Sequence, residues 1–167
     1  AAPAATDRAQ AESQKLNAIF DEYFEEYLQQ NPILATSIGD PRYNDRFVVG
    51  ISPAAIAAEE KLHRDYLARL QSVDRAVLPA ADQLSYDIFK TGREREIEGF
   101  KFPDELIPLN QFYSTPNSFA QLGSGNGMQP FKTVQDYDNF LKRLDGFVAW
   151  ADQAIVNMKQ GVQRGYT

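Results

Sequence analysis

The sequence of 167 residues contains no cysteine and only one histidine, His63. Without thiols the chain cannot form a disulfide framework, a thiolate metal site or a cysteine nucleophile. A single imidazole excludes, within one copy of the chain, a zinc site built from two or three histidines. No stretch approaches the roughly 18 consecutive apolar residues of a membrane-spanning helix, so no transmembrane span is predicted.

Basic residues are also scarce. Lysine and arginine number 17 against 23 aspartates and glutamates, a formal net charge of −6. This balance argues against a protein that neutralises nucleic-acid phosphates or coats an anionic membrane. Apolar residues make up 43% of the chain and charged residues 24%, which is typical of a globular protein. Composition therefore predicts an acidic globular domain and indicates little about its chemistry.

Hydrophobic periodicity predicts a mostly α-helical fold. The expected helices span about 7–30, a short segment from Asn31-Pro32 to Gly39, a long one opened by Ser52-Pro53, about 79–98, one or two turns from Thr115-Pro116 to Gly123, and the end of the chain from Thr133. In the fourth helix Leu84, Ile88 and Phe89 are expected to face inward.

The last 35 residues predict a helical hairpin. Thr133 and Asp136 have the spacing of a capping box, and apolar residues continue at helical spacing to Val162. Gly146 marks a break or a tight corner between two helices. The fold class is thus a multi-helix array with long helices, a final helical hairpin and one long irregular loop over 100–132. Such long loops are often binding loops or lids.

The two ends of the sequence suggest that it is part of a longer protein. A run of small residues without an initiating methionine, Ala1–Thr6, commonly remains after cleavage of a signal peptide, and an expression boundary is an equally good explanation. Gly165-Tyr166-Thr167 directly follows a helical pattern, as expected of a cut. We predict a disordered tail over 1–6 and a single helical domain over 7–167.

Two motifs carry weak chemical signals. Glu60 and His63 have the Glu-x-x-His spacing of di-iron bundles, but only a symmetric dimer could supply the second pair, and a packed histidine is the simpler interpretation. The run Gly123–Gly127 lacks the third glycine of a dinucleotide fingerprint and the Gly-Lys-Ser/Thr of a phosphate loop. A mobile loop with glycines at positive φ is the better interpretation.

Other residue clusters favour structural roles. The acidic neighbours Glu22, Glu25 and Glu26 are expected on a solvated helix face. Six aromatic residues fall in the irregular stretch, where they are expected to pin the loop to the helices rather than to line a groove: Phe100, Phe102, Phe112, Tyr113, Phe119 and Phe131.

Several segments together resemble a known bacterial family. They are Asn31-Pro32 with Ala35, Thr36 and Gly39; 82–90; 96–103; 108–111; 123–133; 136–144; and 161–167. In order and spacing they resemble the N-terminal part of exported proteins and lipoproteins grouped as domain of unknown function eight-eight-five (DUF885). The resemblance covers nearly the whole chain after about residue 15.

The resemblance implies a part of a larger enzyme. Members of the family resemble zinc-dependent gluzincin peptidases, with a metal-binding His-Glu-x-x-x-x-His-like segment in their C-terminal half. This sequence has no such motif, so no catalytic, cofactor or metal residue is carried over, and zinc is expected only in a C-terminal part. The resemblance further implies export to the periplasm or lipid anchoring at the bacterial cell envelope.

The leading functional hypothesis is therefore a non-catalytic helical part that walls the substrate channel of a metal-dependent peptidase. Its partners would be the C-terminal catalytic part of the same protein and short peptides. Within the irregular stretch we expect Asn110, Gln111, Ser124 and Asn126 to face the substrate cleft. The alternatives are a self-contained helical module that binds a protein or peptide through the loop, and a dimeric metal–carboxylate bundle through Glu60 and His63.

Overall fold

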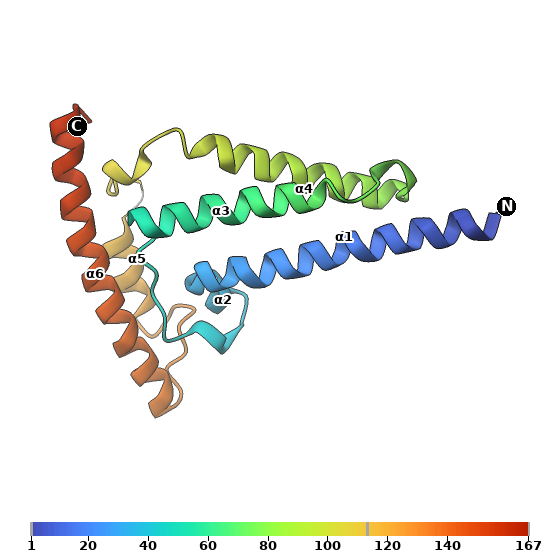
Figure 1. Ribbon diagram of the computed structural model, residues 1–167. Helices are drawn as coiled ribbons and strands as arrows, with labels where there is room; N and C mark the ends of the chain where they lie inside the picture. Colours follow the sequence, from blue (N-terminus) through green and yellow to red (C-terminus); the bar gives the residue numbers. More distant parts are fainter. Residues whose placement is uncertain (1, 113, 167) are drawn as a thin grey trace. The chain divides into compact units, whose positions relative to one another are not determined.

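The computed structural model describes residues 2–112 and 114–166, with side chains from Thr6 onward. These residues form α-helices and short 3-10 turns, which confirms the predicted mostly α-helical fold, and they contain no β-strand (Figure 1). In chain order the helices are α1 (Ala2–Gln30), α2 (Pro32–Ser37), α3 (Pro53–Leu70), α4 (Ala80–Gly99), α5 (Thr115–Leu122) and α6 (Val134–Arg164), and the 3-10 turns are η1 (Pro41–Tyr43), η2 (Arg75–Val77) and η3 (Asp104–Leu106). No helix among the described residues is both long and apolar enough to cross a membrane.

The chain folds into two compact units, and the single helical domain over 7–167 stays a prediction. Unit 1 comprises the chain up to Tyr27 together with Ala57–Lys101, and unit 2 comprises Leu28–Ile56 and the chain from Phe102 onward. Because α1 begins at Ala2, residues 2–6 belong to a helix rather than to the disordered tail that we predicted.

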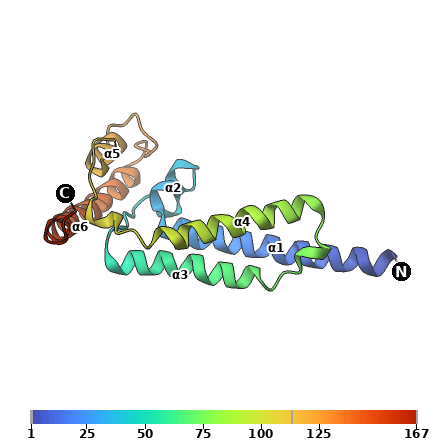
Figure 2. The same cartoon turned by 90° about the horizontal axis from the view of Figure 1, so that it is seen from above.

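Unit 1 is a bundle of three long helices, with α3 running antiparallel to α1 and α4 (Figure 2). Tyr23 lies at the centre of its core, with its ring edge-on to Tyr66 at 5.4 Å and to Phe89 at 5.1 Å between centroids. The buried core consists of Leu16, Ile19, Tyr23, Leu62, Tyr66, Leu70, Val73, Leu78 and Tyr86. Burying these apolar side chains is the main source of stability for this unit.

The predicted inward face of α4 was wrong at two positions. Leu84 and Ile88 are 61% and 64% exposed, while Tyr86 is buried and Phe89 is partly buried. The inward face is rotated because the large aromatic rings, which remove more apolar surface from water, occupy the contacts with α1 and α3.

Unit 2 is organised around α6, the longest helix. A capping box begins it: the Thr133 hydroxyl accepts from the Asp136 amide at 3.2 Å, and the Asp136 carboxylate accepts from the Thr133 amide at 2.8 Å. This pairing was predicted and satisfies two amides that the helix leaves free. Gly165, at φ 83°, ends the helix in the left-handed conformation that glycine adopts most readily.

The predicted final hairpin was wrong, because α6 continues unbroken through Gly146. A Cβ built on Gly146 would lie 2.7 Å from the Phe47 carbonyl oxygen and 2.8 Å from the Phe47 Cβ. The glycine is therefore required for the close approach of the segment around Phe47 to the helix, and it does not mark a corner.

Two loop aromatics pin the irregular stretch to α6, as predicted. Phe119 stacks on Phe147 at 4.4 Å, and Phe131 lies against Phe140 at 5.2 Å between centroids. Phe102 and Phe112 are instead 64% and 81% exposed. Phe100 lies in unit 1 near His63, and Tyr113 lies outside the described residues.

Candidate functional site

A pocket of about 480 Å³ lies beside α5 in unit 2. It is bounded by residues of α2, α5, the glycine loop that follows α5, and the segment after η1. Its lining consists of Ile33, Phe47, Thr115, Ser118, Phe119, Gln121, Leu122, Gly127 and Met128. This volume falls in the range of pockets that bind small ligands or single side chains of a peptide.

Local sequence rules place α5 at the pocket. The Ser114 hydroxyl caps the helix by accepting from the Asn117 amide at 3.4 Å, one residue before the predicted cap at Thr115. Phe119 and Leu122 are buried, while Ser118 and Gln121 of the same helix are exposed at the pocket. The helix thus presents both an apolar wall and hydroxyl and amide groups.

The glycine loop closes one side of the pocket. Gly125 has φ 79°, the positive value expected for a glycine turn. A Cβ on Gly127 would lie 3.0 Å from the Gln121 carbonyl oxygen, so the loop backbone packs directly on the end of α5. The loop therefore builds a wall, and no phosphate-binding geometry was predicted or found there.

The chemistry of the lining is neutral. Thr115, Ser118 and Gln121 offer hydrogen-bond donors and acceptors, and the remaining lining residues are apolar or glycine. No lining residue ionises near neutral pH. Such a surface suits an uncharged, partly apolar group held by burial and a few hydrogen bonds. Among the lining residues, the Thr115 and Ser118 hydroxyls have no ionisable group that could act as a base.

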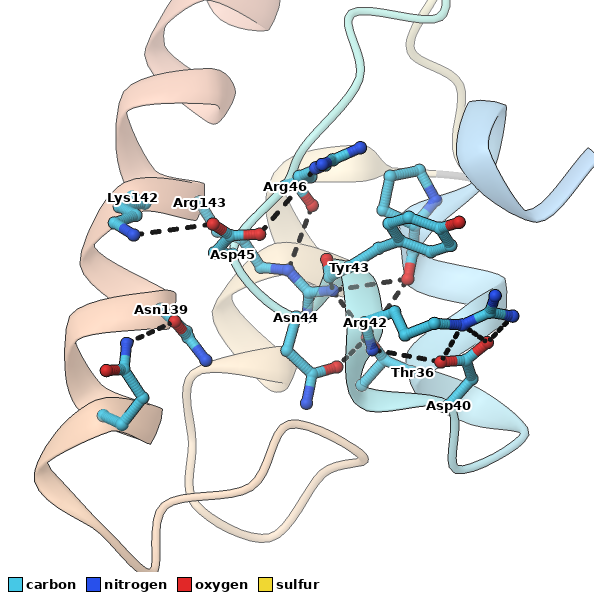
Figure 3. A network of polar contacts seen from close by, with 12 residues as sticks. Thr36, Asp40, Arg42, Tyr43, Asn44, Asp45, Arg46, Asn139, Lys142 and Arg143 are labelled. Carbon is cyan, nitrogen blue, oxygen red and sulfur yellow. Dashed lines mark hydrogen bonds and ion pairs between the residues drawn. The ribbon is translucent and has the colours of Figure 1, made fainter. Parts of the chain in front are cut away.

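A buried arginine holds the segments that carry two of the pocket walls (Figure 3). Arg143 of α6 has 0% exposure, and its guanidinium donates to the Tyr43 carbonyl at 3.0 Å, the Arg46 carbonyl at 3.1 Å and the Thr36 hydroxyl at 2.5 Å. It also donates to the Gln129 side chain. Residues next to these acceptors in sequence, Phe47 and Met128, line the pocket.

The Arg143 network contains no buried carboxylate. Thr36 donates onward to Asn44 at 2.7 Å, and both side chains are buried. Burial lowers the pKa of the Arg143 guanidinium from its usual 12.5 to about 10, while the Asp45 carboxylate acts in the opposite direction. Arg143 stays protonated at neutral pH, and its guanidinium donors are directed at carbonyl and side-chain oxygens.

The four residues predicted to face a cleft do not line this pocket. Asn110, Gln111, Ser124 and Asn126 are all exposed. The Asn110 side chain accepts from the Phe112 amide at 2.8 Å, the Ser124 hydroxyl donates to the Gln121 carbonyl at 2.8 Å, and the Asn126 amide donates to the Ser124 hydroxyl at 3.3 Å. These contacts stabilise the turns that precede and follow α5, and none of the four residues belongs to the pocket lining.

The pocket-lining residues of α5 were missed by the sequence analysis. The available signal was the spacing of Phe119 and Leu122 on one face with Ser118 and Gln121 beside it, an amphipathic pattern within a short helix. The contributions of Ile33 and Phe47 have no local signal, because they reach the pocket only through tertiary packing.

Glu60 and His63 do not form a metal site in the described structure. The Glu60 carboxylate accepts from Arg64 at 2.6 Å, and the nearest carboxylate to the His63 ring is that of Glu59, at 3.9 Å. His63 is 1% exposed, and neither ring nitrogen has a hydrogen-bond partner within the described chain. Aromatic rings surround it, as the packed-histidine interpretation expects. The described residues hold no cluster of three or more metal-ligating side chains.

The acidic residues of α1 serve unit 1. Glu22 pairs with Arg69 at 2.5 Å, and Glu26 accepts from the Tyr66 hydroxyl at 2.8 Å. Burial, and then the hydrogen bond to Glu26, raise the pKa of Tyr66 to about 12. These contacts join α1 to α3, so Glu22 and Glu26 have structural roles.

The described residues thus form an all-helical protein with a pocket beside α5 whose lining is uncharged. In a comparison with known families, residues 32–167 match the family described as bacterial protein of unknown function (DUF885). The chain belongs to that family. No curated protein and no solved structure matches the chain.

Proposed function

We propose that this chain is the N-terminal, non-catalytic helical part of an exported, metal-dependent peptidase-like hydrolase, located in the periplasm or anchored at the cell envelope. In this proposal it walls the substrate channel, and a C-terminal part of the same protein supplies the reacting groups and any zinc. The DUF885 membership supports this proposal, since the family's resemblance to gluzincin peptidases implies such a division.

The observation that carries the proposal is the neutral pocket beside α5. An apolar side chain of a short peptide would be buried against Phe119, Leu122 and Met128. The peptide backbone, which always offers both a donor and an acceptor, would hydrogen-bond with Ser118 and Gln121 at the rim. A charged substrate would gain nothing from this lining.

The test measures binding and hydrolysis with one probe, a fluorescein-labelled Ala-Ala-Phe-Ala-Ala peptide. The 167-residue chain should bind it weakly, in the micromolar to millimolar range, and leave it uncleaved with or without added zinc. Ser118→Phe fills the pocket mouth and should weaken binding at least about tenfold. Ala120→Phe, on an exposed part of α5 outside the pocket, is the matched control and should bind as the wild type does.

Two results would contradict the proposal. Hydrolysis of the peptide by the chain alone would place reacting groups within it. Equal binding by the Ser118→Phe and Ala120→Phe variants would remove the pocket as the peptide site.

A further inference from the structure

Helix α6 has two apolar faces, and only one of them is covered. The face turned into unit 2 carries Arg143, Trp150, Ala154, Asn157 and Gly161, all buried. The second face, here named the α6 seam, consists of Val134, Tyr137, Leu141, Leu144, Val148, Ala151, Ile155, Met158 and Val162. Seven of these nine side chains are exposed, from 37% at Leu144 to 78% at Val134.

The spacing of the α6 seam indicates what covers it. Its residues alternate in steps of three and four, so that Val134, Leu141, Val148, Ile155 and Val162 recur every seven residues. An apolar heptad sustained over four repeats is typical of a surface that packs against another α-helix, each side chain fitting between side chains of the partner. At 1.5 Å per residue the seam is about 42 Å long. An exposed apolar surface of this length is uncommon in a monomer and marks an interaction site.

The charge along one edge of the seam selects among partner helices. Asp138, Asp145 and Asp152 follow the first position of three successive repeats by four residues, so they line the same edge at intervals of about 10.5 Å. Lys159 has this position in the fourth repeat, so the edge is acidic over its first three repeats. All three are exposed, and none forms an ion pair within the part of the chain described. A partner helix with lysine or arginine opposite them would be favoured, as at the edges of coiled coils.

A second copy of α6 is a poor occupant. In an antiparallel pair centred near Val148 the two acidic edges would face each other and bring Asp145 opposite Asp152. In a parallel pair the acidic edge would face the positions of Phe147 and Ala154, which pack inside unit 2. The antiparallel pair would place Lys159, which has the same edge position in the fourth repeat, opposite Asp138, but it would leave Asp145 and Asp152 facing each other. The parallel pair supplies no positive charge to the acidic edge.

We propose that the α6 seam binds an amphipathic α-helix of a partner, one with apolar residues at the same heptad spacing and with lysine or arginine along the edge that meets Asp138, Asp145 and Asp152. This surface is separate from the pocket beside α5, and the proposal stands or falls independently of the peptidase-like function.

The test uses two synthetic peptides of four heptads each, identical in their isoleucine and leucine seam and carrying either lysine or glutamate at the edge positions. The chain should be monomeric by light scattering. By isothermal titration at low salt it should bind the lysine peptide at least about tenfold more tightly than the glutamate peptide. Asp145→Lys/Asp152→Lys changes only exposed side chains and should reverse this preference. Gln160→Lys, also exposed but on the polar face of α6, is the control and should keep it.

A second variant tests the apolar part of the surface. Leu141→Ser/Ile155→Ser should abolish binding of the lysine peptide while the circular dichroism spectrum and the thermal midpoint stay close to wild type, because both side chains are exposed. Equal affinity for the two peptides, or a dimer of the chain that the Leu141→Ser/Ile155→Ser variant dissociates, would overturn the proposal.

Discussion

At the scale of single residues, Arg143 and His63 show two outcomes of burying a polar side chain. Arg143 meets carbonyl and side-chain oxygens from three segments of unit 2, so that most of its donors are satisfied. His63 is buried among aromatic rings, with both ring nitrogens unpartnered in the described chain. Leaving a buried polar group unpaired costs free energy, whereas pairing it fixes the segments that carry its partners. Arg143 therefore positions η1 and α2 on α6.

Arg143→Ala should lower the free energy of unfolding of unit 2 by about 3–5 kcal/mol, because the buried side chains of Thr36 and Gln129 and the Arg46 carbonyl lose the guanidinium donor and a cavity opens. Urea unfolding followed by fluorescence of Trp150, the one tryptophan and a buried residue of α6, measures this directly. Lys142→Ala, at the exposed neighbouring position, loses only an exposed ion pair with Asp45 at 3.5 Å and is the control, which should change the free energy of unfolding by less than about 1 kcal/mol. Equal midpoints for the two variants would show that the guanidinium does not hold the network.

At the scale of elements, glycines inside helices have two different roles. In α6, Gly146 and Gly161 let other backbone approach, since added Cβ atoms would lie 2.7 Å from the Phe47 carbonyl oxygen and 2.8 Å from the Leu106 carbonyl oxygen. In α4, a Cβ on Gly92 would meet nothing within 4 Å. A helical glycine without close neighbours only lowers helix stability, because its backbone loses more freedom on folding.

Gly146→Ala and Gly92→Ala should therefore change stability in opposite directions. Gly146→Ala should destabilise the protein by about 1–3 kcal/mol through overlap with Phe47, despite the higher helix propensity of alanine. Gly92→Ala should stabilise it by about 0.5–1 kcal/mol. Urea denaturation followed by circular dichroism compares the two variants. A stabilising effect of Gly146→Ala would mean that the segment around Phe47 can move away at no cost.

At the scale of the whole molecule, the two units carry buried ionisable groups of opposite kinds. Burial raises the pKa of Tyr23, and the pKa of Tyr66 is raised to about 12, in unit 1. Burial lowers that of Arg143 to about 10 in unit 2. Between pH 10 and 12 the folded state holds more protons at Tyr66 than the unfolded state and fewer at Arg143. The tyrosine contribution to stability is complete below pH 10 and is lost as the pH rises to 12. The cost of burying the charged Arg143 is complete below pH 10 and shrinks over the same range.

Tyr66→Phe isolates the tyrosine contribution. The variant loses the hydrogen bond to Glu26 and should be less stable than wild type by about 1 kcal/mol at pH 8. Above pH 10 the difference in the free energy of unfolding should shrink by up to about 1.4 kcal/mol per pH unit. The reason is that the wild type then loses stability, because Tyr66 ionises at lower pH in the unfolded state than in the folded state, whereas the phenylalanine variant has no such group. Urea unfolding from pH 8 to pH 11.5, followed by circular dichroism, measures the difference. A deficit that stays constant with pH would contradict the raised pKa, and Arg143 cancels in the comparison.

Much of the fold was predictable because helix type and helix ends depend on neighbouring residues. The proline-led starts of α2 and α3 and the Thr133–Asp136 capping box were read correctly from spacing. For the candidate site, the sequence indicated the stretch of chain that contributes to it but not the individual residues that line it. The stretch 100–132 does contribute α5 and its glycine loop to the pocket, whereas Asn110, Gln111, Ser124 and Asn126 do not line it, and their place at a substrate cleft stays a prediction.

The sequence by itself determined that the chain is helical and where most of its helices begin and end, since capping, proline geometry and periodicity act over one or two turns. The order and spacing of its motifs also indicated its family. Only the tertiary structure decided that Gly146 lies within a helix, that Leu84 and Ile88 face outward, and that Arg143 lies at the centre of unit 2. The Arg143 contact with Thr36 joins residues 107 positions apart. Such contacts depend on which helix faces meet, and burial of the largest apolar surfaces selects those faces across the whole unit.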